Sequence, residues 1–444
     1  ESRNVDHQAV LDAFGIEVLG EHDDQSITLW MNPTGKRWRL KSPANWKPAE
    51  ILQAVGESAT GVLWRTDGDP PEGRYKPHEL RDAVAVAAAA APRLTANRLV
   101  GQGVWKHRER LLVVNGAEAH LYDGTEFEPV SHPRLDNKII DFNADKAWFG
   151  DIVGAVQQID AEQAKAAFDE LRGILANWNW SHESDPEVVV ALVAATFVQA
   201  CWTWRPLVSI IGASDSGKST LLQEVLVTIF GDWCIAADRS TEAGLRQAIA
   251  GDAAPVVIDE FDKYKQRQQV LELFRTASRG GEILRGTQDQ SGLRYGVRHL
   301  AWFAAIESGD IWGQDRNRFI RPELRPPENR GSLVLPGQSE LRELGQRLVA
   351  AAIWAASAAV SMADIIKNER IDGVQGRLIE SFAVPAAMSA ILSDGREASE
   401  QTARATLRRM IDGRGVLASQ GERDEVQLLS DIMTANLRVP QTSE

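Results

Sequence analysis

The segment that most constrains this chain is a glycine-containing loop that directly follows a short apolar run, Leu207–Ile211. The loop matches the pattern G-x-x-x-x-G-K-[ST], and residues 221–230 continue with helical spacing. In a strand–loop–helix unit, such a loop wraps its backbone N–H groups around phosphates at the start of the helix. The sequence therefore predicts binding of a nucleoside triphosphate by Gly212, Ala213, Ser214, Asp215, Ser216, Gly217, Lys218, Ser219 and Thr220.

Four side chains are expected to carry the chemistry of this site. Lys218 should neutralise charge on the β- and γ-phosphates, and the hydroxyl group of Ser219 should hold Mg²⁺. A second apolar run, Pro255–Ile258, ends in Asp259 and Glu260. We expect Asp259 to reach the Mg²⁺ shell and Glu260 to polarise the attacking water. Two adjacent carboxylates with separate roles predict that ATP is hydrolysed and not merely bound.

Two further elements have expected roles around the γ-phosphate. The apolar run Leu300–Ile306 should lie beside the strand that carries the carboxylate pair, with Ser308, or Glu307 as second choice, facing the phosphate. Arg318, with Arg316 as second choice, lies too far beyond this strand to reach its own nucleotide easily. It can reach the nucleotide of a neighbour as an arginine finger, which predicts a ring or filament of subunits. The alternatives are a plain strand end and a surface ion pair.

A basic hairpin is predicted just before the run Leu300–Ile306. Two β-type segments, 282–286 and 293–298, surround a turn, and residues 263–298 contain eight basic against three acidic residues. Hydrolysis does not require such a hairpin, but a ring that pushes a polymer through its centre does, and cations suit a phosphate backbone. The alternative is an edge hairpin with solvated arginines. The expected nucleic-acid contacts are Arg285, Arg294, Arg298 and His299.

Charge and cysteine content limit the broad class of protein. The formal net charge is −13, yet residues 201–330 contain 17 basic and 17 acidic residues, so the acidic excess lies outside this segment. This distribution argues against coating of nucleic acid by the whole chain and allows a local channel. Cys201 and Cys234 form no C-x-x-C pair, and a reduced, cytoplasmic compartment fits. The apolar stretch 348–363 is expected to be too short for a membrane span.

The 444 residues are sufficient for several domains. Segments 26–40 and 111–122 predict β-hairpins, the second with an Asn115-Gly116 turn. The run 36–41 mixes cations with an aromatic residue. We interpret it as a solvated edge strand, with a contact to nucleic acid as the alternative. We expect a mixed, β-leaning N-terminal domain over 1–155, a helical collar over 156–200, an ATPase core over 201–332 and a helical C-terminal domain over 333–444.

In order, the chain contains the phosphate-binding loop, the Asp-Glu strand, a helix, a basic hairpin, a further strand and the segment Arg316–Phe319. This order resembles α/β P-loop ATPases of the AAA+ class that carry a hairpin before the sensor strand. The 107 residues from Gly212 to Arg318 have a compactness similar to superfamily 3 helicases and to the helicase part of phage or plasmid primase–helicase proteins. Segments 202–206 and 377–385 also look like that phage-type group.

The resemblance implies a hexameric ring that couples ATP hydrolysis to movement on single-stranded or forked DNA. By the same match Arg377 would contact the nucleotide as a sensor-2 arginine, with a helix-surface role as the alternative. One departure is that superfamily 3 members usually end the sensor strand in Asn, where this chain has Glu307 and Ser308.

The hypothesis drawn from the sequence is a Mg²⁺-dependent DNA helicase of phage or mobile-element replication, working in the cytoplasm of a bacterial host, with no membrane partner. Any primase or polymerase domain is expected upstream of Glu1 or on another chain, because the sequence begins at Glu and fits a piece of a longer protein. The alternatives are an AAA+ remodelling or loading ATPase whose hairpin grips protein, and a nucleotide-dependent switch or assembly protein.

Overall fold

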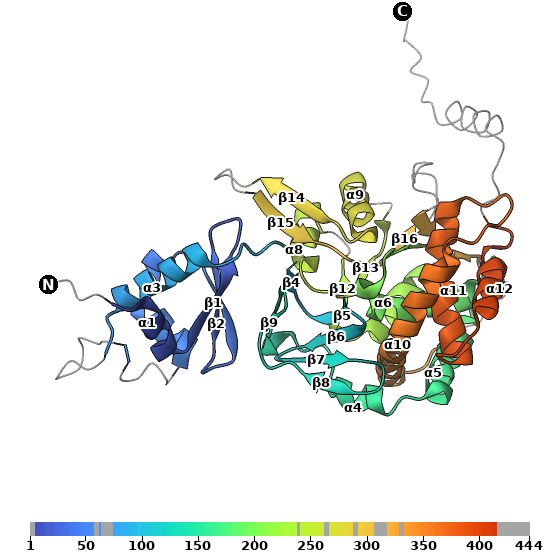
Figure 1. Ribbon diagram of the computed structural model, residues 1–444. Coiled ribbons are helices and arrows are strands. Elements are labelled where there is room, and N and C mark those ends of the chain that lie inside the picture. Colours follow the sequence, from blue (N-terminus) through green and yellow to red (C-terminus); the bar gives the residue numbers. More distant parts are fainter. Residues whose placement is uncertain are drawn as a thin grey trace, which may run out of the picture.

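The computed structural model describes residues 5–56, 62–63, 74–96, 98–237, 240–261, 266–286, 292–305, 318–327 and 333–414. An N-terminal lobe stands beside a larger body (Figure 1). The lobe contains an antiparallel sheet, in which Lys36 pairs with Met31 as predicted for the first hairpin. Asp6 caps the first helix through the N–H groups of Gln8 and Ala9. The elements are α1 (His7–Phe14), β1 (Ile16–Glu21), β2 (Ile27–Met31), β3 (Lys36–Leu40), α2 (Pro48–Val55) and α3 (Pro77–Ala90).

A second set of short strands lies between the lobe and the rest of the body. Its main sheet is a meander in which Val114 pairs with Ala119 across a turn where Gly116 has φ 63°, as expected of an Asn-Gly hairpin. The strands are β4 (Leu99–Val100), β5 (Gly103–His107), β6 (Arg110–Asn115), β7 (Glu118–Tyr122), β8 (Phe127–Pro129), β9 (Arg134–Leu135) and β10 (Lys138–Ile140). Leu112 and Val114 share a core with Ala253. The same core includes Leu19 and Trp30 of the lobe, so within 1–155 the second set of strands packs on both the lobe and the body.

The body is built on a parallel sheet with the order β12-β13-β16-β11-β17, while β18 continues along β11. Ile258 pairs with Phe303, and Ile211 pairs with Ala305. The strand predicted to lie beside the carboxylate strand does so, and it separates that strand from the phosphate-binding loop. The strands are β11 (Leu207–Gly212), β12 (Ile235–Ala236), β13 (Val256–Ile258), β16 (Ala301–Ala305), β17 (Phe319–Ile320) and β18 (Glu323–Leu324).

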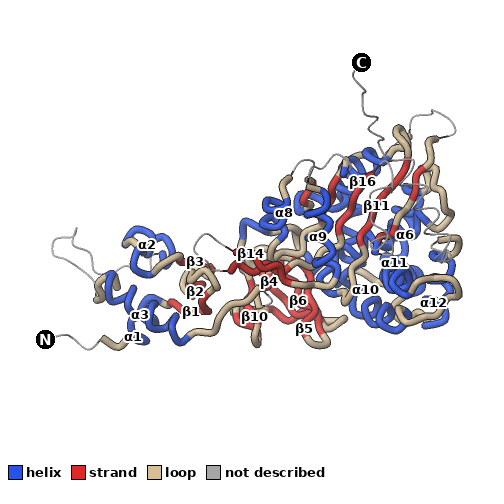
Figure 2. The backbone as a smooth tube through the Cα atoms, turned by 90° about the horizontal axis from the view of Figure 1, so that it is seen from above, coloured by secondary structure: helices blue, strands red, loops and turns tan. Residues whose placement is uncertain are grey.

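Helices cover both faces of this sheet (Figure 2). Alternate side chains on each strand explain the layers, because Phe303 packs with α8 and α9 while Trp302 and Ala304 pack with the helices of the opposite face. The helices of the body are α4 (Ile152–Gln157), α5 (Ala161–Leu175), α6 (Asp185–Phe197), α7 (Val227–Phe230), α8 (Glu242–Ile249), α9 (Arg267–Ser278), α10 (Gln338–Ile366), α11 (Gly376–Asp394) and α12 (Glu400–Ile411). The hairpin of β14 (Glu282–Gly286) and β15 (Gly292–Gly296) projects from this body (Figure 1).

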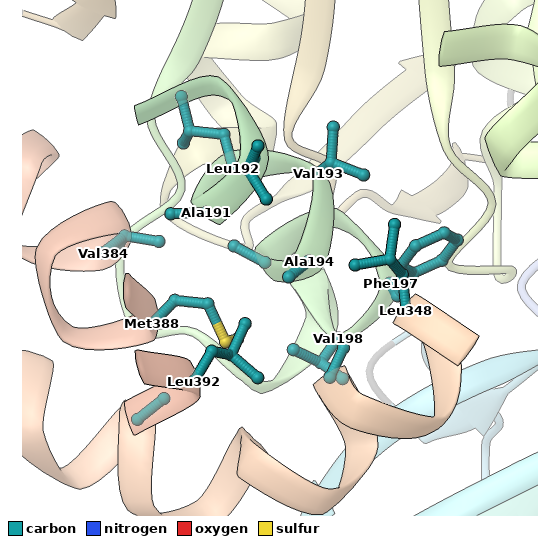
Figure 3. Packing of buried hydrophobic residues seen from close by; sticks show 14 of the residues in the cluster. Ala191, Leu192, Val193, Ala194, Phe197, Val198, Leu348, Val384, Met388 and Leu392 are labelled. Atoms are coloured by element: carbon teal, nitrogen blue, oxygen red, sulfur yellow. The ribbon is translucent and has the colours of Figure 1, made fainter. Parts of the chain in front are cut away.

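Helix α6 is apolar on all sides because it lies between the sheet and the C-terminal helices. Its residues Ala194 and Phe197 belong to one core with Leu348 of α10 and Met388 of α11 (Figure 3). The segments predicted as separate collar, core and C-terminal domains therefore share one hydrophobic core.

Helix α10 is, within the described part of the chain, the helix whose length and mean hydropathy of 1.8 would suffice to cross a membrane. In this fold 61% of that apolar window is buried. Ala351, Ala355 and Ala359 are fully covered by neighbouring elements. Packing against α6 and α11 therefore accounts for the apolar composition of α10.

Truncation of Leu192 to Ala should lower the free energy of unfolding by about 2–5 kcal/mol, because this fully buried side chain leaves a cavity that its neighbours fill only in part. The matched control is Ile365→Ala on α10, where the side chain is 47% exposed and the change should stay within about 0.5 kcal/mol. Urea denaturation followed by tryptophan fluorescence measures both. Equal losses for the two variants would contradict the core position of α6.

Candidate functional site

The phosphate-binding loop begins where β11 passes close to β18. Gly212 pairs with Leu324, and a Cβ at Gly212 would lie 2.3 Å from the Leu324 carbonyl oxygen, which leaves room only for glycine. Gly217 has φ +85°, and a Cβ there would lie 2.8 Å from the indole nitrogen of Trp178. The two glycines of the motif are thus required by close approach and by backbone conformation. The loop between them is exposed at Ala213, Ser214 and Asp215.

Lys218 lies across the loop that precedes it. Its Nζ donates to the carbonyl oxygens of Gly212 at 2.5 Å and Ala213 at 2.7 Å. Ser219 is exposed in the first turn of the helix, and Thr220–Leu226 forms a π-helix before α7. The predicted helix therefore begins in π form, a geometry frequent at functional sites. A cation, helical N–H groups and an exposed hydroxyl group are brought together, as binding of a magnesium triphosphate requires.

Asp259 and Glu260 follow β13 at the same edge of the sheet, one strand beyond β16. Asp259 is 8% exposed, and its Oδ1 accepts a hydrogen bond of 2.8 Å from the backbone N–H of Glu260. Glu260 is exposed and adopts φ +49°, a left-handed conformation that costs a non-glycine residue about 1–2 kcal/mol. Strain of this kind clusters at functional sites. A buried carboxylate and an exposed one thus stand near the phosphate-binding loop with different surroundings.

Two residues are predicted to hold Mg²⁺: Ser219, in the helix start after β11, and Asp259, directly after β13; both strands flank β16. The described residues contain no group of three or more His, Cys, Asp or Glu side chains with metal-ligand geometry. Mg²⁺ commonly takes one or two protein ligands and completes its shell with substrate phosphates and water. The hydroxyl–carboxylate pair therefore fits a magnesium nucleotide better than a resident metal ion.

The predicted sensor residues Glu307 and Ser308, and the second-choice finger Arg316, lie outside the described residues. The register of β16 still bears on them. Ala305 pairs with Ile211, one residue before the phosphate-binding loop. The end of β16 at Ala305 therefore lies between the strands that lead to the loop and to the carboxylate pair.

Arg318 and Arg377 both lie against one tryptophan near the amino-terminal ends of the strands. The guanidinium carbons are 5.9 Å and 5.8 Å from the ring centroid of Trp204, which precedes β11. Phe319, next to Arg318, pairs with Leu207 at the start of β11, whereas the phosphate-binding loop follows its end.

This arrangement keeps Arg318 away from the nucleotide of its own chain, so its predicted action on a neighbour stays a prediction. For Arg377 the geometry disagrees with the sensor-2 role within one chain. The cause is the docking of α11, because Ser381 of this helix accepts a hydrogen bond of 3.1 Å from the Trp204 indole. That contact holds the start of α11 at the edge of the sheet opposite the phosphate-binding loop.

The hairpin predicted before the sensor strand is present, with Leu284 paired to Arg294 and Arg285 paired to Leu293. The side chains of Arg285 and Arg294 lie outside the described part, so their contacts with nucleic acid stay predictions. Arg298 is half-buried at the base, 5.9 Å from the Trp105 ring, rather than on the projecting strands.

His299 contradicts the prediction of a nucleic-acid contact. The side chain is fully buried, and its Nδ1 accepts a hydrogen bond of 3.2 Å from the backbone N–H of Arg298. Burial, aided by the charge of Arg205, lowers the pKa of His299 to about 3. A buried neutral imidazole cannot bind a phosphate, so its role is packing at the base of the hairpin.

Two residues beside the phosphate-binding loop were missed by the sequence analysis as parts of this site. Trp178 is buried and donates from its indole nitrogen to the Gly217 carbonyl oxygen at 3.2 Å. Arg325 is exposed directly after β18 and donates to Ser181 Oγ at 3.0 Å. Neither residue belongs to a motif. Only the pairing of β18 with β11 brings Arg325 to this edge.

The fold and site define a mixed α/β protein with a parallel sheet and a glycine-rich loop at the carboxyl end of a central strand. No protein-family model matches the chain, and no curated protein matches it. Among solved structures, the apo A form of the NrS-1 C-terminal region is similar with a TM-score of 0.41 and 12% identity, over 86% of this chain and 75% of that chain. This degree of similarity is too low to carry an argument about function.

The burial of His299 predicts a pH-dependent stability. In the unfolded chain the pKa is 6.5, whereas in the folded chain it is about 3. As the pH falls below 6.5, His299 becomes protonated in the unfolded state but stays neutral in the folded state. This group should therefore lower the free energy of unfolding by about 1.4 kcal/mol per pH unit. Denaturant unfolding at pH 7 and pH 5 should show a smaller loss for His299→Gln than for wild type. The exposed control His78→Gln should behave as wild type, and an unchanged loss in His299→Gln would contradict the assignment.

Proposed function

We propose that the chain is a Mg²⁺-dependent ATP hydrolase of the AAA+ class, working as a ring of subunits that moves on single-stranded or forked DNA in phage or mobile-element replication. The observation that carries the proposal is the common edge of the sheet. There the loop with Lys218 and Ser219 and the pair Asp259–Glu260 follow strands separated only by β16. Ligands of open parallel sheets bind beyond the carboxyl ends of the strands, which supports a nucleotide site at this edge.

In this proposal the residues of the chain divide the work of hydrolysis. Lys218 exchanges the carbonyl oxygens of Gly212 and Ala213 for phosphate oxygens, because the phosphates carry full negative charge and the carbonyl groups do not. The carboxylate of Glu260 orients the attacking water and accepts its proton. Mg²⁺ held through Ser219 and Asp259 would offset charge that develops on the β- and γ-phosphates. The buried setting of Asp259 strengthens this electrostatic contribution.

The basic hairpin is the feature that favours a translocase over a simple switch. It interrupts the chain between α9 and β16, and its base reaches the strand that leads to the nucleotide edge. A change at that edge could therefore move the hairpin along a polymer. Stimulation of ATP hydrolysis by single-stranded DNA is the test, since a remodelling factor would respond to protein and a switch to neither.

Replacement of Glu260 by Gln should retain ATP binding and reduce turnover by about 10²–10⁴-fold, because the amide cannot accept the proton of the attacking water. Binding of a fluorescent ATP analogue and release of phosphate measure the two effects. The control is Glu272→Gln on the exposed face of α9, which makes the same chemical change away from the site. Turnover equal to wild type in Glu260→Gln would remove this residue from the mechanism.

Action of Arg318 on a neighbouring subunit predicts complementation. Arg318→Ala and Lys218→Ala should each lose about 10³-fold or more in turnover when alone. In mixed assemblies a subunit with intact Lys218 can meet a neighbour with intact Arg318, so about one quarter of the sites should recover in a random head-to-tail ring. Phosphate release after mixing measures this recovery. Mixtures as inactive as the separate variants would rule out the finger in trans.

A further inference from the structure

A groove of about 530 Å³ separates the N-terminal lobe from the base of the hairpin. One wall is strand β3, the edge of the lobe's sheet. Arg37, Arg39 and Lys41 lie at alternate positions and line the groove together, while Trp38 packs toward the core of the lobe. The opposite wall includes Tyr295 of β15. The edge strand expected to be merely solvated therefore directs its cations toward the base of the hairpin.

The groove contains carboxylates as well as basic side chains, so the exposure of each side chain determines which charges a ligand would contact. Asp141 and Asp252 are buried beneath the surface, with side chains only 12% and 16% exposed, and both pair with Lys146. Arg39 is 52% exposed although it pairs with Asp24 at 2.9 Å. Lys41 is exposed, and the described contacts include no ion pair for it. Asp23 and Asp24 also line the groove, with side chains 25% and 32% exposed, so the surface carries both signs, but Arg39 is more exposed than any of the four carboxylates.

The groove is continuous with the hairpin through several contacts. Tyr295 stacks beneath Arg246 of α8, with the guanidinium carbon 4.3 Å from the ring centroid. The backbone N–H of Gly251 donates to the Gly296 carbonyl oxygen at 3.5 Å. These contacts hold the base of the hairpin against the wall opposite β3. A polymer that follows the hairpin would meet the cations of β3 next.

We propose that the groove between β3 and the hairpin binds the phosphate backbone of a nucleic-acid strand, with Arg39 and Lys41 as the principal contacts. This proposal depends on the proposed function in one respect, namely that the nucleic-acid strand also runs along the hairpin. Cations on alternate residues of an extended strand face the same way and can follow an extended polyanion, as in other grooves that track single strands. Contacts of this kind are independent of base sequence and sensitive to salt.

The experiment is equilibrium binding of a fluorescently labelled 30-nucleotide oligo-dT to the full chain without nucleotide, at several salt concentrations. The double variant Arg39→Gln/Lys41→Gln should bind about tenfold more weakly at 0.1 M salt. The slope of the logarithm of its binding constant against the logarithm of salt concentration should become shallower by about 0.7 for each lost phosphate contact. Lys41→Gln alone should show part of the loss. This single variant breaks none of the described ion pairs, so its result does not depend on the Arg39–Asp24 contact.

The matched control is Lys36→Gln, which removes the same charge from the other end of β3 at a position outside the groove lining. It should bind the oligonucleotide as wild type does. Equal binding by wild type and both groove variants, or an equal loss in Lys36→Gln, would overturn the proposal. ATP hydrolysis by wild type, measured in parallel, separates the two hypotheses. A chain that lacks hydrolysis but keeps the groove-dependent binding contradicts only the proposed function, whereas DNA-stimulated hydrolysis without groove dependence contradicts only this inference.

Discussion

Parallel pairing of β16 between β11 and β13 is the constraint on which the arrangement of the site depends. It brings the carboxyl ends of all three strands to one edge. The glycine-rich loop and the Asp259–Glu260 pair therefore lie at the same edge, although Lys218 and Asp259 are 41 residues apart in the sequence. The fully apolar strands tolerate this central position because each face is covered by helices. Loss of that cover would expose the strands and separate the two halves of the site.

Arg205 connects the start of β11 to the helix before the hairpin, at the end of the strands opposite the phosphate-binding loop. The guanidinium group is buried and donates to carbonyl oxygens of Gln199 at 2.7 Å and Trp202 at 2.6 Å, just before β11. A weaker bond of 3.4 Å reaches Ser278, at the end of α9. Burial lowers the pKa of Arg205 to about 9. One side chain thus ties the start of the loop-bearing strand to the helix that leads into the hairpin.

The two edges of the sheet carry different chemistry. The carboxyl edge holds the loop and the carboxylates, whereas Arg318 and Arg377 lie with Trp204 toward the amino edge. A strand rises about 3.3 Å per residue, so the length of β11 keeps these arginines from the loop of the same chain. Within one chain the two sets of residues are therefore held apart.

The sequence by itself determined the local units. The glycine pattern, the apolar run ending in Asp259 and Glu260, the turn at Asn115-Gly116 and the two strands of the basic hairpin all predicted elements that the structure contains, because each is fixed by neighbouring residues. It could not determine that the second set of strands packs on both the lobe and the body, or that α6 and α10 share a core with the sheet. Nor could it determine that His299 is buried, that Arg377 docks on Trp204, or that β3 faces the hairpin. These features depend on contacts between residues far apart in the chain, and only the packing of whole elements decides which side chains are buried and which remain exposed.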